Sequence, residues 1–292
     1  MPVTPSPAVL RAGELLGHLA RHPSDAFSVS ELARTFEFPR PTCDSILQAL
    51  AHHAFVVRRP DLRYELGVGC LTLGDAARAA SALLRAASVE ADGLSRALGL
   101  SAATSVRVGG EVRVVEAFDV GAPFSFRVRA GESVPLVPPF GAVFVAWDED
   151  DAEQWLRQAP DDRSRWQRAL DCIRERGYSV SLHTARQADL ERNLELLAQQ
   201  PDALEGQRER QELIHALQHS EYLPTELDGD TLRLASLAAP VFDGAGRVVA
   251  SLQVLGPNYE LTNEQVRKLG EEVTRAAQRA SASPAHATGG GR

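Results

Sequence analysis

The side chains with the clearest chemistry lie early in the chain and suit contact with a polyanion. Arg58, Arg59 and Arg63 follow one another closely, and Arg40 lies a little before them. Guanidinium groups bind phosphate oxygens, often through two parallel hydrogen bonds. Gln48, between these arginines, carries the paired donor and acceptor that match the edge of an adenine base in the major groove. The sequence therefore indicates contact with the backbone and bases of double-stranded DNA.

Two helices joined by a tight turn are predicted to position these side chains. Ser28 and Glu31 form a capping-box pattern, so the first helix should begin there. The chain then turns through residues 37–39, and Pro41 suits the first turn of a second helix because proline lacks a backbone N–H group. Apolar residues at helical spacing should bury one face of this second helix: Cys43, Ile46, Leu47 and Leu50.

The opposite face of the second helix is left free for a partner. It carries Thr42, Asp44, Ser45, Gln48 and His52. A hairpin should follow, with strands at 55–59 and 64–66 around a turn at 60–63. These elements in this order are typical of a winged helix-turn-helix, which places its second helix in the major groove and its wing along the phosphates. A small helical subdomain that happens to cap correctly is the alternative.

The net charge of −8 at first argues against a nucleic-acid partner. Residues 1–68, however, hold seven arginines and seven acidic residues, so this part is neutral and the rest carries the excess negative charge. DNA responds to the local patch of charge. We expect modest affinity per protomer, and therefore a homodimer. The residues predicted to contact DNA are Arg40, Pro41, Thr42, Ser45, Gln48, His52, Arg58, Arg59 and Arg63.

Two stretches resemble a known family. Residues 8–67, especially SVSELARTFEFPRPT and RRPDLRYELG, resemble the DNA-binding module of the IclR family of bacterial transcription regulators. Residues 238–257, AAPVFDGAGRVVASLQVLGP, followed by LTNEQVRKLGEEV, resemble the end of that family's effector-binding domain. The resemblance implies a GAF-like sensor domain and assembly of the dimer into a tetramer.

The predicted fold class is α+β, with a winged helix-turn-helix joined by a helical linker to the GAF-like effector-binding domain. The expected domains are the winged helix-turn-helix at 1–67, the linker and first helix of the second domain at 68–99, and the effector-binding domain at 100–280. A small, polar tail at 281–292 should be disordered. Small linker residues are candidates for part of the dimer contact, with a monomeric spacer as the alternative: Ala76, Ala77, Ala79 and Ala80.

Further elements follow from local patterns. A helix before the capping box should carry an apolar face made of Val9, Ala12, Leu16, Leu19 and Ala20. Gly109 and Gly110 predict a hairpin, and Thr262 with Gln265 predicts a capped closing helix whose inner stripe is Val266, Leu269 and Val273. We also expect strands at 124–128, 178–182, 232–242 and 247–255, helices at 150–157 and 163–176, and polar helices within 184–220.

The effector is expected to be hydrophobic. In the family, a histidine and hydroxyl residues often follow a Pro-Leu pair, and a cysteine precedes the AAP run; here Pro135 and Leu136 lead into an apolar loop, and Ser236 occupies the cysteine's place. This loss of polar groups favours an aromatic or other hydrophobic carboxylate, held mainly by burial. A core without ligand is the alternative. The predicted effector-binding residues are Phe126, Arg127, Arg129, Phe140, Gly141, Ser236 and Gln253.

The sequence contains no motif of a catalytic, phosphate-binding or dinucleotide-binding site, so we expect no enzyme and no cofactor. Glu212, His215 and His219 share one helix face, but a further ligand is not evident and an exposed polar helix explains them equally well, so no metal is expected. The three cysteines lack metal or disulfide spacing. Without an apolar span or signal, the protein should be cytoplasmic and make no membrane contact.

These features together predict a ligand-responsive transcriptional regulator that reads a palindromic operator as a dimer. The alternative is a sensor or interaction protein whose helix-turn-helix no longer reads DNA. Asp44 and the neutral charge of residues 1–68 favour that alternative, because a DNA-reading helix is usually more basic.

Overall fold

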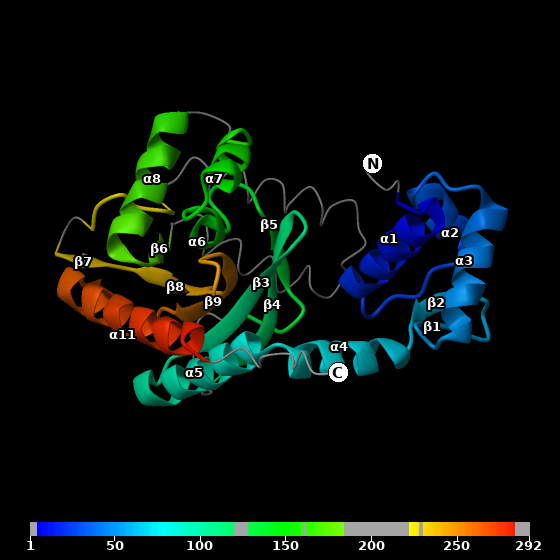
Figure 1. Cartoon of the computed structure of the whole chain (residues 1–292), viewed down its shortest axis with the longest axis horizontal. Helices are drawn as coiled ribbons and strands as arrows, with labels where there is room; N and C mark the ends of the chain where they lie inside the picture. Colours follow the sequence, from blue (N-terminus) through cyan, green and yellow to red (C-terminus); the bar gives the residue numbers. More distant parts are fainter. Residues whose placement is uncertain (1–4, 120–127, 160–161, 184–221, 228–229, 284–292) are drawn as a thin grey trace, which may run out of the picture. The chain divides into compact units, whose positions relative to one another are not determined.

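The computed structural model describes residues 5–119, 128–159, 162–183, 222–227 and 230–283. The chain divides into two compact units, residues 1–80 and 81–292 (Figure 1). The linker expected at 68–99 is therefore shared between them, because its first helix belongs to the first unit and its second helix to the second. None of the helices in the described ranges is long and apolar enough to cross a membrane.

The first unit begins with three helices and a hairpin, as the local patterns predict. Their bounds are α1 Pro7–Arg21, α2 Val29–Thr35, α3 Arg40–His52, β1 Val56–Arg58 and β2 Tyr64–Leu66. The capping box between Ser28 and Glu31 is present. The unit's core is closed by large side chains at most 1% exposed, which include Leu15, Leu19 and Tyr64. Val9 was wrongly assigned to the buried stripe: it lies in the first turn of α1 and is 69% exposed.

Two further helices confirm that the stretch expected at 68–99 is helical. They are α4, Gly69–Ala80, and α5, Ala82–Leu98. Ser81 separates them, and its side chain accepts a hydrogen bond from the Leu84 N–H group, which caps α5. α4 has no buried residue within its unit.

The second unit is built on a six-stranded antiparallel sheet with the strand order β5-β4-β3-β9-β8-β6. Its strands are β3 Ala102–Val108, β4 Glu111–Phe118, β5 Ser133–Pro135, β6 Ser179–Leu182, β8 Leu234–Phe242 and β9 Val248–Leu255. The β3–β4 hairpin turns at Gly109 and Gly110 as predicted, with Gly109 at a φ of 60° that favours glycine. Two short strands, β7 Thr231–Leu232 and β10 Leu261–Thr262, pair separately.

Helices cover both faces of this sheet and create two cores (Figure 1). On one side lie α5 and α11, Asn263–Ser281; on the other lie α6, Ala142–Val145, α7, Glu149–Leu156, and α8, Arg163–Arg176. The Thr262–Gln265 capping box starts α11, and Val266 and Val273 are buried as expected, with Leu269 half-buried. The sequence patterns did not predict α6.

Some expectations lie outside the described residues. They are most of the strand at 124–128, the polar helices within 184–220 with the possible metal ligands Glu212, His215 and His219, and the end of the tail. The tail's expected start at residue 281 overlaps α11 by one residue, because this helix ends at Ser281.

Candidate DNA-binding surface and effector face

The helix α3 has one buried and one open face. Cys43, Ile46, Leu47 and Leu50 are all buried, as their spacing predicts. Five of the predicted DNA-contacting residues on this helix are exposed: Arg40, Pro41, Ser45, Gln48 and His52. Thr42 is half-buried. The open face therefore offers hydroxyl, amide and imidazole groups together with one guanidinium, which are the groups used to contact bases and phosphates.

Asp44 has a specific partner on the same face. The Gln48 Nε2 group donates a hydrogen bond of 2.8 Å to Asp44 Oδ2, one turn earlier. A carboxylate can only accept, so this contact fixes which end of the Gln48 amide points toward Asp44. Gln48 keeps its Oε1 and one N–H group, the pair that an adenine edge requires. Asp44 is thus compatible with base recognition.

The wing hairpin presents two exposed arginines. Arg59 forms an ion pair with Glu65 on the opposite strand, at 3.4 Å between Nη1 and Oε2. The Arg58 guanidinium lies over the Tyr64 ring, 5.9 Å from its centroid. Both arginines are exposed, although Tyr64 is buried, so phosphate can compete for the two guanidinium groups: an exposed ion pair is weak, and so is a cation–π contact of an exposed cation.

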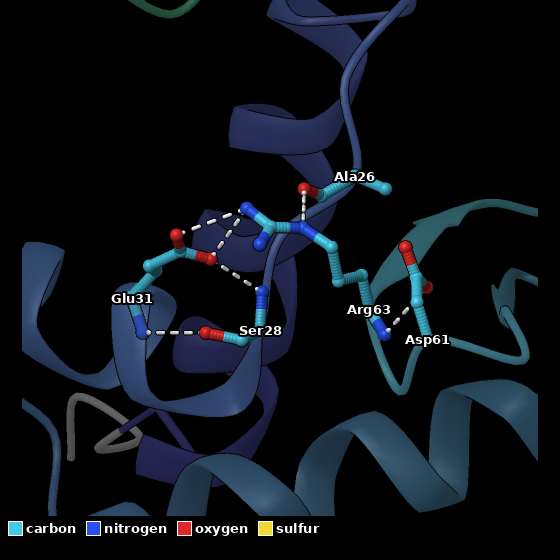
Figure 2. A network of polar contacts seen from close by, with 5 residues as sticks. All are labelled: Ala26, Ser28, Glu31, Asp61 and Arg63. Atoms are coloured by element: carbon cyan, nitrogen blue, oxygen red, sulfur yellow. Dashed lines mark hydrogen bonds and ion pairs between the residues drawn. The ribbon is translucent and has the colours of Figure 1, made fainter.

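Arg63, also predicted to contact DNA, is held within its own unit (Figure 2). Its Nε group donates to the Ala26 carbonyl oxygen at 2.7 Å, and its Nη2 group donates to Glu31 Oε1 at 2.9 Å and Oε2 at 3.0 Å. Glu31 is the capping-box carboxylate of α2. Hydrogen bonds with Ser28 hold the pKa of Glu31 below its ordinary value; burial opposes this shift, and the hydrogen bond and charge of Arg63 lower the pKa further.

In the second unit, strand alternation shows which predicted effector residues share a face. Ala238 packs in the core with α6–α8, whereas Leu237 and Ala239 pack in the core with α5 and α11. Ser236 therefore faces the α6–α8 side. Gln253 faces the same side because it lies directly opposite Ala238 in the β8–β9 register.

Sequence reasoning missed other hydroxyl groups on this face. Ser181 lies opposite Ser236, and Ser251 lies opposite Pro240, so both point to the α6–α8 side, and both are buried. The alternation of side chains in β6 indicates that Ser179 and Ser181 share one face of the strand. It does not tell which side of the sheet this is, and only the pairing of Ser181 with Ser236 in β8 assigns it to the α6–α8 side.

The loop before α6 approaches the same side of the sheet. The Phe140 ring packs edge-on against Tyr222, 5.8 Å between centroids, and its carbonyl oxygen accepts a hydrogen bond from Trp155 Nε1 at 2.8 Å. Gly141 has a φ of 74°, and a Cβ atom there would lie 2.3 Å from Leu136 Cδ1. Packing thus accounts for Gly141 without a ligand.

The remaining predicted effector residues are not brought to this face by described contacts. Arg129 is exposed in the turn before Glu132, and Phe126 and Arg127 lie outside the described residues. Two cavities, of about 360 and 170 Å³, open on the described part of the second unit, and none of the predicted effector residues lines either. The larger is lined by Arg176, Tyr178, Thr225, Glu226, Leu227 and Arg267.

Two models of one protein family match the chain. The IclR helix-turn-helix domain matches residues 8–60, and the bacterial transcriptional regulator IclR C-terminal domain matches residues 182–282. The chain belongs to the IclR family. It is thus an IclR-type transcriptional regulator with a helix-turn-helix and a C-terminal effector domain, which confirms the resemblance of both stretches.

Solved structures share this fold at low sequence identity. An IclR transcriptional regulator from Alicyclobacillus acidocaldarius is 22% identical, with a TM-score of 0.68 over 96% of this chain and 99% of that chain. An IclR-family regulator from Brucella abortus is 18% identical, with a TM-score of 0.62 over 96% of this chain and 94% of that chain. Pseudomonas aeruginosa HmgR is 22% identical, with a TM-score of 0.59 over 94% of this chain and 98% of that chain. No curated protein sequence matches the chain.

Proposed function

We propose that this IclR-family protein binds a palindromic operator as a homodimer and releases or rearranges on it when a small effector binds the second unit. The observation that carries the proposal is the open polar face of α3 beside a wing with two exposed arginines. α3 enters the major groove, and the wing follows the phosphates.

Base contacts come from the middle of α3 in this proposal. Gln48 reads an adenine with its free Oε1 and N–H groups, while Thr42 and Ser45 contact base edges or phosphates. Arg40, Pro41 and His52 lie at the two ends of α3, where the helix meets the DNA backbone, and Arg58 and Arg59 bind phosphates.

The dimer uses α4. This helix buries no residue within its unit, although Leu71 and Leu73 are 68% and 56% exposed. Exposed apolar side chains followed by Ala76, Ala77, Ala79 and Ala80 suit close packing against a second helix. A second copy of α4 is the simplest partner, because a palindrome requires two-fold symmetry. Tetramer formation would use further surfaces.

The effector binds the α6–α8 side of the sheet, and it is a hydrophobic or aromatic carboxylate. Ser236, Gln253 and Phe140 supply two polar groups and an aromatic ring on that side. Phe126, Arg127, Arg129 and Gly141 remain predictions from the sequence alone. The protein performs no chemistry on this molecule. Binding shifts the population between two arrangements of the DNA-binding units, which requires different affinity for the two.

A gel shift with the DNA upstream of the protein's own gene tests this function. We expect binding at low salt that weakens at moderate salt, and a change in mobility or affinity when aromatic carboxylates are added. Absence of binding at low salt would instead support a sensor or interaction protein with a helix-turn-helix that no longer reads DNA.

A thermal-shift screen tests the effector class separately. Hydrophobic carboxylates should raise the melting temperature, because a ligand that binds only the folded state stabilises it. Stabilisation by small polar acids alone would overturn the assignment of ligand class.

A further inference from the structure

The contacts of Arg63 join two parts of the chain that are distant in sequence. Its side chain reaches from the tip of the wing to Glu31, 32 residues away, and to the carbonyl oxygen of Ala26, 37 residues away (Figure 2). Both partners belong to the segment that starts α2. The Arg63 guanidinium therefore spans the gap between the wing and the first helix of the helix-turn-helix.

The Glu31 carboxylate accepts hydrogen bonds both from the start of α2 and from the wing. Its Oε2 atom accepts a hydrogen bond of 2.7 Å from the Ser28 N–H group, which completes the capping box, while both oxygens accept from Arg63. The Nη2 group donates to both carboxylate oxygens while Nε of the same planar guanidinium donates to the Ala26 carbonyl oxygen, so contacts in two directions constrain its orientation more than a single contact does. The wing arginine is thus attached to a carboxylate that is itself fixed by the helix start.

The backbone also holds the tip end of strand β2, where Tyr64 pairs with Arg58 just before the turn. Phe27 and Tyr64 exchange hydrogen bonds of 2.9 and 2.7 Å, and Tyr64 is buried. Beyond this bridge, the tip is a tight turn in which Leu62 adopts a φ of 66° and the Arg63 N–H group donates to Asp61 Oδ1. The Arg63 side chain therefore links this tip to the α2 segment through its hydrogen bonds to Ala26 and Glu31.

We propose that Arg63 is a positioning residue of the wing, anchored by Glu31, and that it orients Arg58 and Arg59 for phosphate without contacting phosphate itself. The Arg59 N–H group donates to the Arg63 carbonyl oxygen at 2.8 Å, so the backbone that carries Arg59 is coupled directly to Arg63. This inference rests on the proposed DNA binding.

The Glu31→Gln variant separates this proposal from simple electrostatics. Glutamine also serves at this position of a capping box, so the start of α2 is kept. The change removes a negative charge and should strengthen DNA binding if only the net charge of the unit mattered. If Arg63 acts by positioning, the same change releases the wing tip and weakens binding.

The experiment measures binding of the full-length protein to a short mixed-sequence duplex over a range of salt concentrations. The variants are Glu31→Gln, Arg63→Gln, the double variant, and Arg58→Gln as the matched control. We expect roughly three- to tenfold weaker binding for each of the first two at any salt, and no further loss in the double variant. Their slope of log K against log salt should stay that of the wild type, whereas Arg58→Gln should lower its magnitude by about 0.9.

Three outcomes would overturn the proposal. Tighter binding by Glu31→Gln would show that charge alone decides, and a slope change in Arg63→Gln equal to that of Arg58→Gln would make Arg63 a phosphate contact. Additive losses in the double variant would show that the two residues act separately. Failure of the wild type to bind the duplex at low salt would instead overturn the proposed function. In that case, chemical denaturation of the wild type, the two single variants Glu31→Gln and Arg63→Gln and their double variant still measures the coupling of Glu31 and Arg63.

Discussion

At the scale of single residues, the hydrogen bond between Asp44 and Gln48 gives the acidic residue a structural role on α3, the helix proposed to enter the major groove. An isolated carboxylate there would repel phosphate. Bonded to the Gln48 amide, it leaves that amide in one orientation. In our proposal, Asp44 therefore influences which base Gln48 recognises, because it orients the Gln48 amide.

Replacement of Gln48 tests this reading. Gln48→Ala should leave binding to mixed-sequence DNA almost unchanged and reduce discrimination against a changed base at one operator position by about 1–3 kcal/mol. Competition binding with single-base operator variants measures it. Unchanged discrimination would remove Gln48 from the base-reading surface.

The lowered pKa of Glu31 gives a pH dependence. A carboxyl group whose pKa is lower in the folded state stabilises the fold above its ordinary pKa of 4.5, and this contribution is lost as the pH falls below that value. Wild-type protein should therefore lose more unfolding free energy than Glu31→Gln between pH 6 and pH 4. Urea denaturation at both values measures the difference, and parallel losses in the two proteins would contradict it.

At the scale of elements, local signals predicted most helices and strands. Ser28 with Glu31, Thr262 with Gln265, and the Gly109–Gly110 turn each carry a complete pattern within a few residues. α6 was missed because its four residues, Ala142–Val145, are all apolar and buried, so they show no helical periodicity. The short pair β7–β10 lacks any local signal because its strands lie far apart in sequence.

The same reasoning explains which site features were predictable. The open face of α3 follows from the spacing of Cys43, Ile46, Leu47 and Leu50, which is a property of one helix. The bond between Arg63 and Glu31 depends on how the wing folds onto α2, and no spacing rule contains it. Ser181 likewise requires the β6–β8 register before its side of the sheet is known.

In our proposal, the wing supplies affinity for DNA without sequence preference. Replacing Arg58 and Arg59 together by alanine should weaken binding to every duplex and reduce the magnitude of the salt slope by about 1.8, from two lost phosphate contacts. Titrations at several salt concentrations measure this slope. A loss confined to the operator would show that the wing reads bases.

At the scale of the whole molecule, α4 decides the oligomer in our proposal. Leu71→Asp should convert the dimer to monomer, because it places a charge among apolar contacts. Light scattering coupled to size exclusion measures the mass. Val89→Asp, at an exposed position of α5, is the matched control and should leave the mass unchanged.

Because Glu31 both completes the capping box and binds Arg63, fewer amino acids can replace it than a capping box alone would allow. Gln265 completes the capping box of α11 in the same way, through hydrogen bonds exchanged with Thr262. In a saturation library selected for repression or activation, the codon for residue 265 should accept both glutamine and glutamate. The codon for residue 31 should reject glutamine, although the two helix starts are alike.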